Sequence, residues 1–379
     1  MIQADIVGGD REFRVVMRGP SVVVFRPRET FLLEKFPTEF GPVNIRYTSR
    51  WLNRGEGATI PGHLWVEVRG FAPDFESAIG VFANAGLAGV SIIATSANAA
   101  VADPEVEIAF DSTRGAKVRE YFQSYVPPET DVQYIGRFIN LKGTRAFSDS
   151  LYVHSDVERL LRATGQYGLA LLNWKYGHAT LSLAHLWMAV EALTDVKIRA
   201  ECAVRGLSGR KNLAESLCVE EKKLDAVIRQ RFILQDDADC YKKAKDASDG
   251  FEHSYHGFDR VFKLSQEVRH RMASYVRSAI FDLAGVEENA KGRLLSEAFG
   301  EPLGPWRVAK YLRGTLQGDR DDLAAAGNEY PFIRWATTVK QGEFDGDGKL
   351  QVQTSETLTT ELAEGVTFSP KSIEAWKPG

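Results

Sequence analysis

The stretch SLAHLWMAVEALTDV, residues 182–196, decides the fold that this sequence predicts. Its apolar side chains recur at the spacing of one helix face, from Leu183 through Trp187 to Leu193. A wider stripe of the same kind precedes it in SDVERLLRATGQYGLALLNW, residues 155–174, where acidic residues occupy the first turn. Only a short turn separates the two segments, so we expect two antiparallel helices of a bundle.

A third helix is the most regular element expected in the chain. In residues 259–285, apolar side chains recur at helical intervals over about seven turns. Asp259 is the expected N-cap, and Gly285 is the residue expected just past the last turn. The segment DGFEHSYHGF, residues 249–258, is expected to be a loop because of its two glycines. Shorter helices are expected at LAESL (213–217) and KKLDAVIRQRF (222–232).

The first part of the chain has a different pattern, with short β-rich runs between glycine and proline residues. Strands are expected at FRVVM (13–17), SVVVF (21–25), FLLEKF (31–36), VNIRYTSRWL (43–52) and HLWVEVRGF (63–71), with a loop at 55–62. One helix that begins after Asp74 is expected to cross this antiparallel sheet. Further strands are expected at SIIATSANA (91–99) and VEIAFD (106–111), and a short helix at VREYFQSYVPPET (118–130).

Beyond residue 286 the pattern is weaker. Short helices are expected at 290–300 and 306–316, a β-hairpin at 331–356, and a partly ordered tail at 358–379. The expected fold class is therefore α+β. It comprises an antiparallel β-rich domain (1–149), an α-helical bundle (150–286) and a small C-terminal appendage with a hairpin (287–379).

The composition is that of an ordinary soluble globular protein. The 379 residues include 47 basic and 51 acidic side chains, and the net charge of −4 does not suggest a polyanion-binding coat. Cys202, Cys218 and Cys240 have spacings that fit neither a disulfide framework nor a zinc site, so we expect reduced thiols. We find no signal peptide and no apolar run of about 18 residues, and expect a cytoplasmic protein without a membrane span.

The order of these segments resembles a known family. Two long helices, the second containing LAHLWMAVEALT, then a polar stretch, DGFEHSYHGF and a helix ending in YVRSAIFDLAGV are similar to the ApeA-like branch of the HEPN helical domains over residues 155–286. The resemblance implies a bundle that often dimerises and that in many relatives is an endoribonuclease of toxin or antiphage systems. A β-rich domain ahead of the bundle is also similar to the ApeA arrangement.

The family's ribonuclease motif is an Arg followed four to six residues later by a His. The resemblance implies metal-independent cleavage, in which the His transfers a proton, the Arg steadies the phosphate and the 2′-hydroxyl attacks. His253 is the matching histidine here, but residues 246–249 contain no Arg, and Lys245 is one position too far. Other cations, namely Arg260, Arg269 and Arg271, could reach the site only through folding or from a second subunit.

The same segment stands out without the family. Asp249, Glu252, His253 and His256 bring four ionisable groups into eight residues, and they suit an acid–base or phosphate site. Asp249 with the two histidines is also a possible zinc ligand set. The third interpretation is a polar loop between helices whose histidines cap helix ends.

Glu191 lies in an otherwise apolar helical stripe, where it either orients a histidine from a buried position or faces water at the stripe's edge. His178 and His185 are expected to be structural. A basic cluster (Arg199, Arg205, Arg210 and Lys211) is either a phosphate-binding patch or a solvated face. Two functions follow, with no cofactor expected in either: an RNA-cleaving or RNA-binding effector that forms homo-oligomers through its bundle, or a non-catalytic binding and dimerisation protein whose β-rich domain recognises a ligand.

Overall fold

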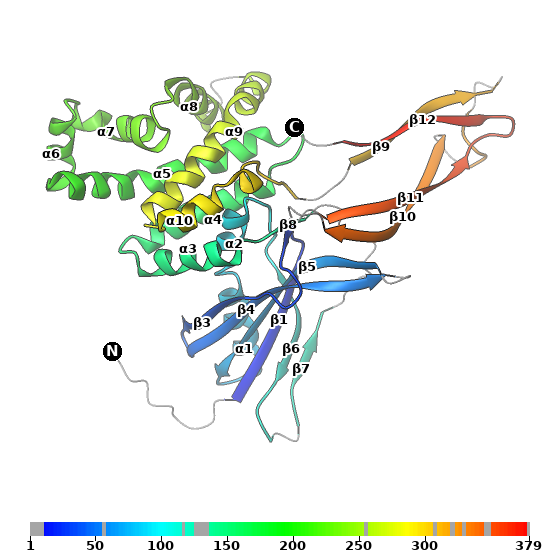
Figure 1. The fold of residues 1–379 in the computed structure, drawn as a ribbon, viewed down its shortest axis with the longest axis horizontal. Coiled ribbons are helices and arrows are strands. Elements are labelled where there is room, and N and C mark those ends of the chain that lie inside the picture. Colours follow the sequence, from blue (N-terminus) through cyan, green and yellow to red (C-terminus); the bar gives the residue numbers. More distant parts are fainter. Residues whose placement is uncertain are drawn as a thin grey trace. The chain divides into compact units, whose positions relative to one another are not determined.

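The chain is an α+β protein in the computed structural model, which confirms the expected fold class (Figure 1). The structure describes residues 11–54, 58–115, 118–124, 136–253, 257–305, 309–318, 323–327, 331–344 and 350–376. Contacts divide the chain into two compact units. The first contains residues 1–50, 62–128 and 137–305, and the second contains residues 51–61, 129–136 and 306–379.

A six-stranded sheet opens the first unit, in the order β3-β4-β5-β1-β6-β7. The pairs β3–β4, β5–β1, β1–β6 and β6–β7 are antiparallel, and β1 buries Phe13, Val15 and Met17 on one face, as strand periodicity requires. The expected early strands are confirmed, and β5 begins at Ala58, inside the expected loop. The strands are β1 (Arg11–Gly19), β3 (Phe31–Thr38), β4 (Gly41–Arg54), β5 (Ala58–Ala72), β6 (Glu105–Asp111) and β7 (Tyr121–Gln123), while β2 (Val23–Val24) pairs in parallel with β8 (Arg137–Phe138).

Two sequence predictions in this region are wrong. SIIATSANA lies mostly in the helix α2 (Val90–Ala97), whose residues are almost all buried, so no periodicity distinguished it from a buried strand. Residues 121–123 form β7 rather than a helix, because the edge of β6 takes an aromatic strand as its partner. The helix α1 (Phe75–Gly86) is capped by Asp74, as expected, and contacts the sheet through Phe75, whose ring centroid is 5.8 Å from that of Phe13.

Residues 75–97 are long and apolar enough to cross a membrane by length and composition, but 56% of the most apolar window is buried inside the protein. The stretch consists of two helices separated by a turn at residues 87–89, and each alone is too short to span a bilayer. Its apolar character is therefore that of buried core helices.

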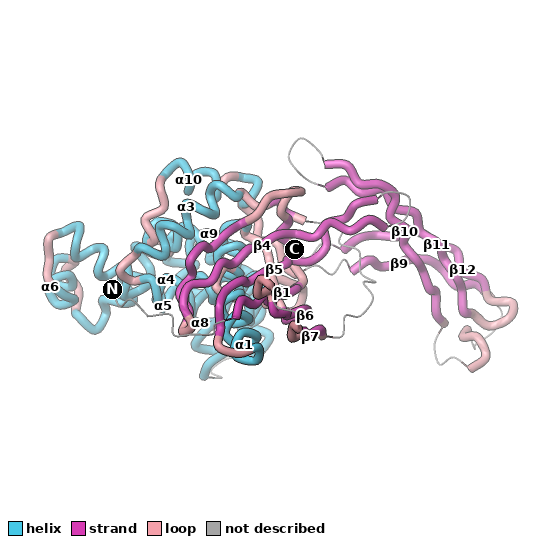
Figure 2. Tube along the Cα trace, turned by 90° about the horizontal axis from the view of Figure 1, so that it is seen from below, coloured by secondary structure: helices cyan, strands magenta, loops and turns pink. Residues whose placement is uncertain are grey.

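The helices that follow form a bundle around α5 (Ala179–Arg205), which is buried on most sides (Figure 2, cyan). The expected long helices are confirmed, and Gly285, with φ of 72°, follows the last of them. Asp259 is not its N-cap, because the helix begins at Phe258 after Gly257. The others are α3 (Leu141–Val153), α4 (Val157–Leu172), α6 (Gly209–Ser216), α7 (Leu224–Val227), a π-helical turn η2 (Ile228–Ile233), α8 (Ala238–His253), α9 (Phe258–Leu283) and α10 (Glu288–Leu294).

A buried arginine joins the bundle to the sheet region. Arg277 of α9 is 3% exposed and donates hydrogen bonds to four carbonyl oxygens. Two belong to Thr95 and Ser96, at 2.8 Å each, in the last turn of α2, where carbonyl groups lack partners within the helix. The other two belong to Leu294, at 2.7 Å, and Phe299, at 3.1 Å. One guanidinium thus closes the end of α2 and holds the segment after α9.

The end of α2 is completed by Arg137 and Asn98. Arg137 donates to the carbonyls of Ala97 and Asn98, at 3.0 and 2.8 Å. Asn98, in the left-handed conformation that ends α2, donates to the Phe299 carbonyl and accepts from the Tyr167 hydroxyl at 2.7 Å. These contacts place the sheet, the bundle and residues 287–305 in one unit. The expected domain boundary at residue 149 falls inside α3, and the one at residue 286 precedes α10 in the same unit.

The second unit contains two antiparallel strand pairs, β10 with β11 and β12 with β9. The hairpin of β10 (Phe332–Phe344) and β11 (Leu350–Glu361) is confirmed, and its turn lies outside the described residues. Two predictions are wrong here: β9 (Ala309–Gln317) was expected to be a helix, and β12 (Thr367–Trp376) a partly ordered tail. These two strands pair with each other across 50 to 67 positions of the sequence, so the pairing does not show in a local pattern.

Candidate functional site

The predicted site lies at the junction of α8 and α9. The segment DGFEH is helical rather than a loop, because α8 continues through Gly250 to His253. Lys245, Asp249 and His253 recur every four residues, which places them along one side of α8. His256 lies outside the described residues, as do the side chains of Glu252 and His253.

Asp249 is held within α8 by an ion pair with Lys245, and this hydrogen bond raises the pKa of the Lys245 ammonium. Both side chains are partly exposed. From the sequence, a histidine was the expected partner of Asp249, whereas its described partner is the lysine one turn earlier. The pair ends one turn before His253.

The pairing of α8 with α9 decides which arginines can reach this end. Arg271 of α9 binds Asp239 at 2.8 Å, and Lys243 binds Glu267 at 3.2 Å, so the two helices run antiparallel. Between residues 239 and 253 a helix rises by about 21 Å. Arg271 therefore lies far from His253 within one chain and is already bound to two aspartates.

Arg269 also does not lie at the predicted site. It is 5% exposed, and its guanidinium carbon lies 4.9 Å from the centre of the Trp174 ring. Arg260, by contrast, is in the first turn of α9, at the same end of the helix pair as His253. Arg260 and Lys263 are exposed, and the side chain of neither forms a hydrogen bond or ion pair with any residue in the part of the chain that the structure describes.

Glu191 does not occupy a buried position beside a histidine. Its side chain is 46% exposed and accepts a hydrogen bond from Arg229 Nη1 at 3.2 Å. Arg229 also donates to Thr194 Oγ1 at 3.1 Å and lies over the Trp187 ring. The edge position weighed in the sequence analysis is confirmed, and Glu191 holds the π-helical turn to α5.

His178 and His185 make local contacts, as expected of structural histidines. His185 Nδ1 lies 2.8 Å from Gln166 Oε1, and His178 Nδ1 lies 3.3 Å from Asn173 Oδ1. Burial lowers the pKa of both imidazoles.

The basic cluster is largely neutralised by neighbouring acids, which favours the solvated-face interpretation. Arg199 binds Asp156, Arg210 binds Asp195 and Asp225, and Arg205 binds Glu201. Arg159 connects Asp156 with Asp195, so acids and bases alternate along this surface.

The described residues contain no group of three or more His, Cys, Asp or Glu side chains able to hold a metal ion. The proposed zinc set includes His256 and the side chain of His253, which lie outside the description. The three cysteines are free thiols, and burial raises the pKa of Cys240 to about 12.

One histidine environment was missed by the sequence analysis. His270 of α9 has its Nδ1 3.3 Å from Glu301 Oε2 and its ring edge-on to Trp174, with centroids 5.0 Å apart. Burial and the nearby Arg269 lower its pKa, and Glu301 opposes the shift. Trp174 and Glu301 are distant from His270 in the sequence, so no local spacing could have shown the group.

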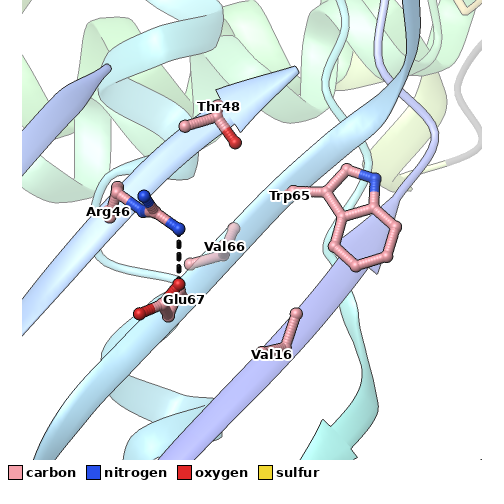
Figure 3. Close-up of a pocket in the computed structure, with 6 residues that line it drawn as sticks. All are labelled: Val16, Arg46, Thr48, Trp65, Val66 and Glu67. Carbon is pink, nitrogen blue, oxygen red and sulfur yellow. Dashed lines mark hydrogen bonds and ion pairs between the residues drawn. The ribbon is translucent and has the colours of Figure 1, made fainter. Parts of the chain in front are cut away.

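A second candidate region is a depression on the sheet face opposite α1, with a volume of about 230 Å³ (Figure 3). It crosses the central strands β4, β5 and β1. Arg46 Nη2 donates to Glu67 Oε2 at 2.5 Å, and the indole of Trp65 stands on the other side. The lining residues are Val16, Arg46, Thr48, Trp65, Val66 and Glu67.

Comparison of the chain with protein-family models, with curated proteins and with solved structures finds no match. The resemblance of residues 155–286 to HEPN domains therefore stays a prediction from the sequence. The α8–α9 junction and the sheet depression are the two regions from which a function can be inferred.

Proposed function

We propose that the protein is a HEPN-type effector that binds and cleaves RNA in the cytoplasm, in toxin or antiphage defence, and that it assembles into homo-oligomers through its helical bundle. The observation that carries the proposal is the α8–α9 junction. There the Lys245–Asp249 pair ends one turn before His253, and Arg260, whose side chain has no partner among the described residues, lies in the first turn of the next helix.

The chemistry needs only groups that this junction supplies. His253 takes the proton of a ribose 2′-hydroxyl, whose oxygen attacks the adjacent phosphorus. The bond from phosphorus to the 5′-oxygen breaks, that oxygen takes a proton from water, and His253 returns its own proton to the solvent. The products are a 2′,3′-cyclic phosphate and a 5′-hydroxyl end. Arg260 and Lys245 stabilise the charge on the phosphate, and Asp249 or Glu252 orients the imidazole.

Incubation of the purified full chain with single-stranded RNA in EDTA tests the proposal. We expect cleavage that leaves cyclic phosphate ends and that falls by about 100-fold or more in His253→Ala, since general acid–base catalysis is worth about 10²–10⁴-fold. Arg260→Ala lowers the rate as well. Activity that requires a metal ion and is lost in EDTA would favour zinc at Asp249, His253 and His256 instead.

Two histidine variants serve as matched controls. His185→Gln leaves the rate unchanged, because His185 only binds Gln166. His270→Gln tests the pair with Glu301: loss of cleavage in this variant, with His253→Ala active, places the chemistry at His270. An absence of cleavage by the purified protein with all RNAs tried overturns the catalytic proposal.

The alternative is a non-catalytic binding or dimerisation protein. It is favoured by the absence of an Arg in the motif window and by the engagement of Arg269 and Arg271 elsewhere. In that case RNA or another ligand binds without being cleaved, and the β-rich region is the recognising part.

A further inference from the structure

The open face of the six-stranded sheet has the features of a base-binding surface. One face of the sheet is buried, while the other exposes alternate residues of β1, β4 and β5 to solvent. On that face the depression of about 230 Å³ is smaller than the roughly 300–1,000 Å³ of pockets for drug-sized ligands. It suits a single ring system rather than a whole large molecule.

The side chains that line the depression are of the kinds that bind the base and the phosphate of a nucleotide. The half-buried indole of Trp65 supplies an aromatic surface, and Arg46 and Thr48 stand opposite it (Figure 3). Glu67 accepts from Arg46 and also lies 3.7 Å from Arg14, so two arginines share one carboxylate. An excess of positive charge and a hydrogen-bond acceptor thus lie beside an aromatic wall.

Most N–H groups of the Arg46 guanidinium have no acceptor among the described residues. Its side chain is 52% exposed, and one of its five N–H groups is used by Glu67. A carboxylate accepts hydrogen bonds from the N–H groups of a base edge, and a guanidinium donates to a phosphate or to a base oxygen.

The face continues beyond the depression as a row of cross-strand neighbours. Tyr121 of β7 is opposite Phe110 of β6, Phe110 is opposite Arg14 of β1, and Arg14 is opposite Arg69 of β5. Tyr121 is 61% exposed. Two aromatic rings followed by two arginines over adjacent strands suit an extended chain of nucleotides better than an isolated one.

We propose that the open face of the sheet binds single-stranded RNA, with one base held in the depression against Trp65 and its phosphate at Arg46. The proposal rests on the proposed function only for the choice of RNA as the source of the base. Free nucleotides have the same ring and phosphate and are the competing source.

The test measures binding of labelled single-stranded oligoribonucleotides and of nucleoside monophosphates to the full chain carrying His253→Ala, so that cleavage does not interfere. Trp65→Ala is expected to weaken oligonucleotide binding by about 5- to 150-fold, because that is the loss of affinity expected when one base no longer stacks on an aromatic ring. Trp65→Phe retains most of the affinity. Tyr176→Ala removes an exposed ring between α4 and α5, outside the sheet, and leaves the affinity unchanged.

The dependence on salt tests the phosphate contact. Arg46→Ala is expected to reduce the slope of log affinity against log salt by about 0.7, the share of one phosphate of a single strand. Monophosphates that bind as tightly as oligonucleotides, through Trp65, overturn RNA as the ligand and assign the depression to free nucleotides.

The inference and the proposed function fail separately. Unchanged binding in Trp65→Ala overturns the sheet-face site even if the wild-type protein cleaves RNA. Binding that depends on Trp65 supports the site even if no RNA is cleaved.

Discussion

Arginine is used in opposite ways in two regions of this molecule. On the outer surface of α4, α5 and α6, Arg159, Arg199 and Arg210 alternate with aspartates in a chain of ion pairs. In the core, Arg277 makes no ion pair with any residue the structure describes, and its partners are backbone carbonyl oxygens. The surface pairs join residues up to 43 positions apart, whereas Arg277 binds a carbonyl 182 positions away in the sequence.

The difference shows that burial decides what an arginine can do for a fold. Exposed pairs are screened by water and are worth about 0–1 kcal/mol each. The buried guanidinium has lost its water, which lowers the pKa of Arg277 to about 10. It remains in the core because the carbonyl end of α2 carries a partial negative charge that matches its own charge.

The largest expected effect comes from removal of the buried arginine. Arg277→Met leaves four carbonyl groups without their donor, and we expect the free energy of unfolding to fall by about 3–5 kcal/mol. Arg277→Lys also destabilises the protein, because an ammonium cannot copy the planar fork of donors. Urea denaturation followed by circular dichroism measures both. If the free energy of unfolding fell by less than about 1 kcal/mol in Arg277→Met, the buried arginine would contribute no more than an exposed ion pair, which would contradict the comparison.

An intermediate effect is expected on the surface chain. Arg210→Ala breaks contacts with Asp195 and Asp225, and we expect a loss of about 0.2–1 kcal/mol that shrinks in high salt. The same denaturation experiment, repeated at low and high ionic strength, measures it. A loss as large as that of Arg277→Met, independent of salt, would contradict the assignment of these pairs to a screened surface.

The smallest effect concerns a side chain between core and surface. Burial lowers the pKa of His185 below its ordinary value of 6.5, so below that pH the unfolded chain binds a proton more readily than the folded one. Its contribution to stability is present above pH 6.5 and is lost as the pH falls through the folded-state pKa. His185→Gln should therefore lose less stability than the wild type between pH 7 and pH 5. Equal pH dependence in urea midpoints of the two proteins would show that His185 is not desolvated.

Much of the fold was predictable because its elements have a local period. The β-rich run of β1 and the long apolar stripe of α9 each depend on neighbours within a few residues, so they were found from the sequence. The stretch of α2 was not, because a helix buried on all sides shows no period. The pairing of β9 with β12 depends on a partner far along the chain and was missed for that reason.

The candidate site was predictable only as a group of residue types. The sequence placed Asp249 and His253 close together, and the helix that contains both was not expected because Gly250 indicated a loop. The partners could not be foreseen: Lys245 for Asp249, Arg229 for Glu191 and Glu301 for His270 are all set by helix geometry or tertiary packing. The sheet depression brings three strands together and had no motif at all.

The hydrogen bonds at the end of α2 also affect the order in which parts of the chain can fold during synthesis. The Asn98 side chain binds the carbonyl of Phe299, a contact that spans 201 positions of the chain. At about 5–20 residues per second, a ribosome needs about 10–40 s to make the intervening residues. During that interval the apolar stretch 75–97 has emerged, while the arginine and the segment that cover its end have not. The end of α2 therefore stays uncovered in the nascent chain until α9 and the segment after it have been made.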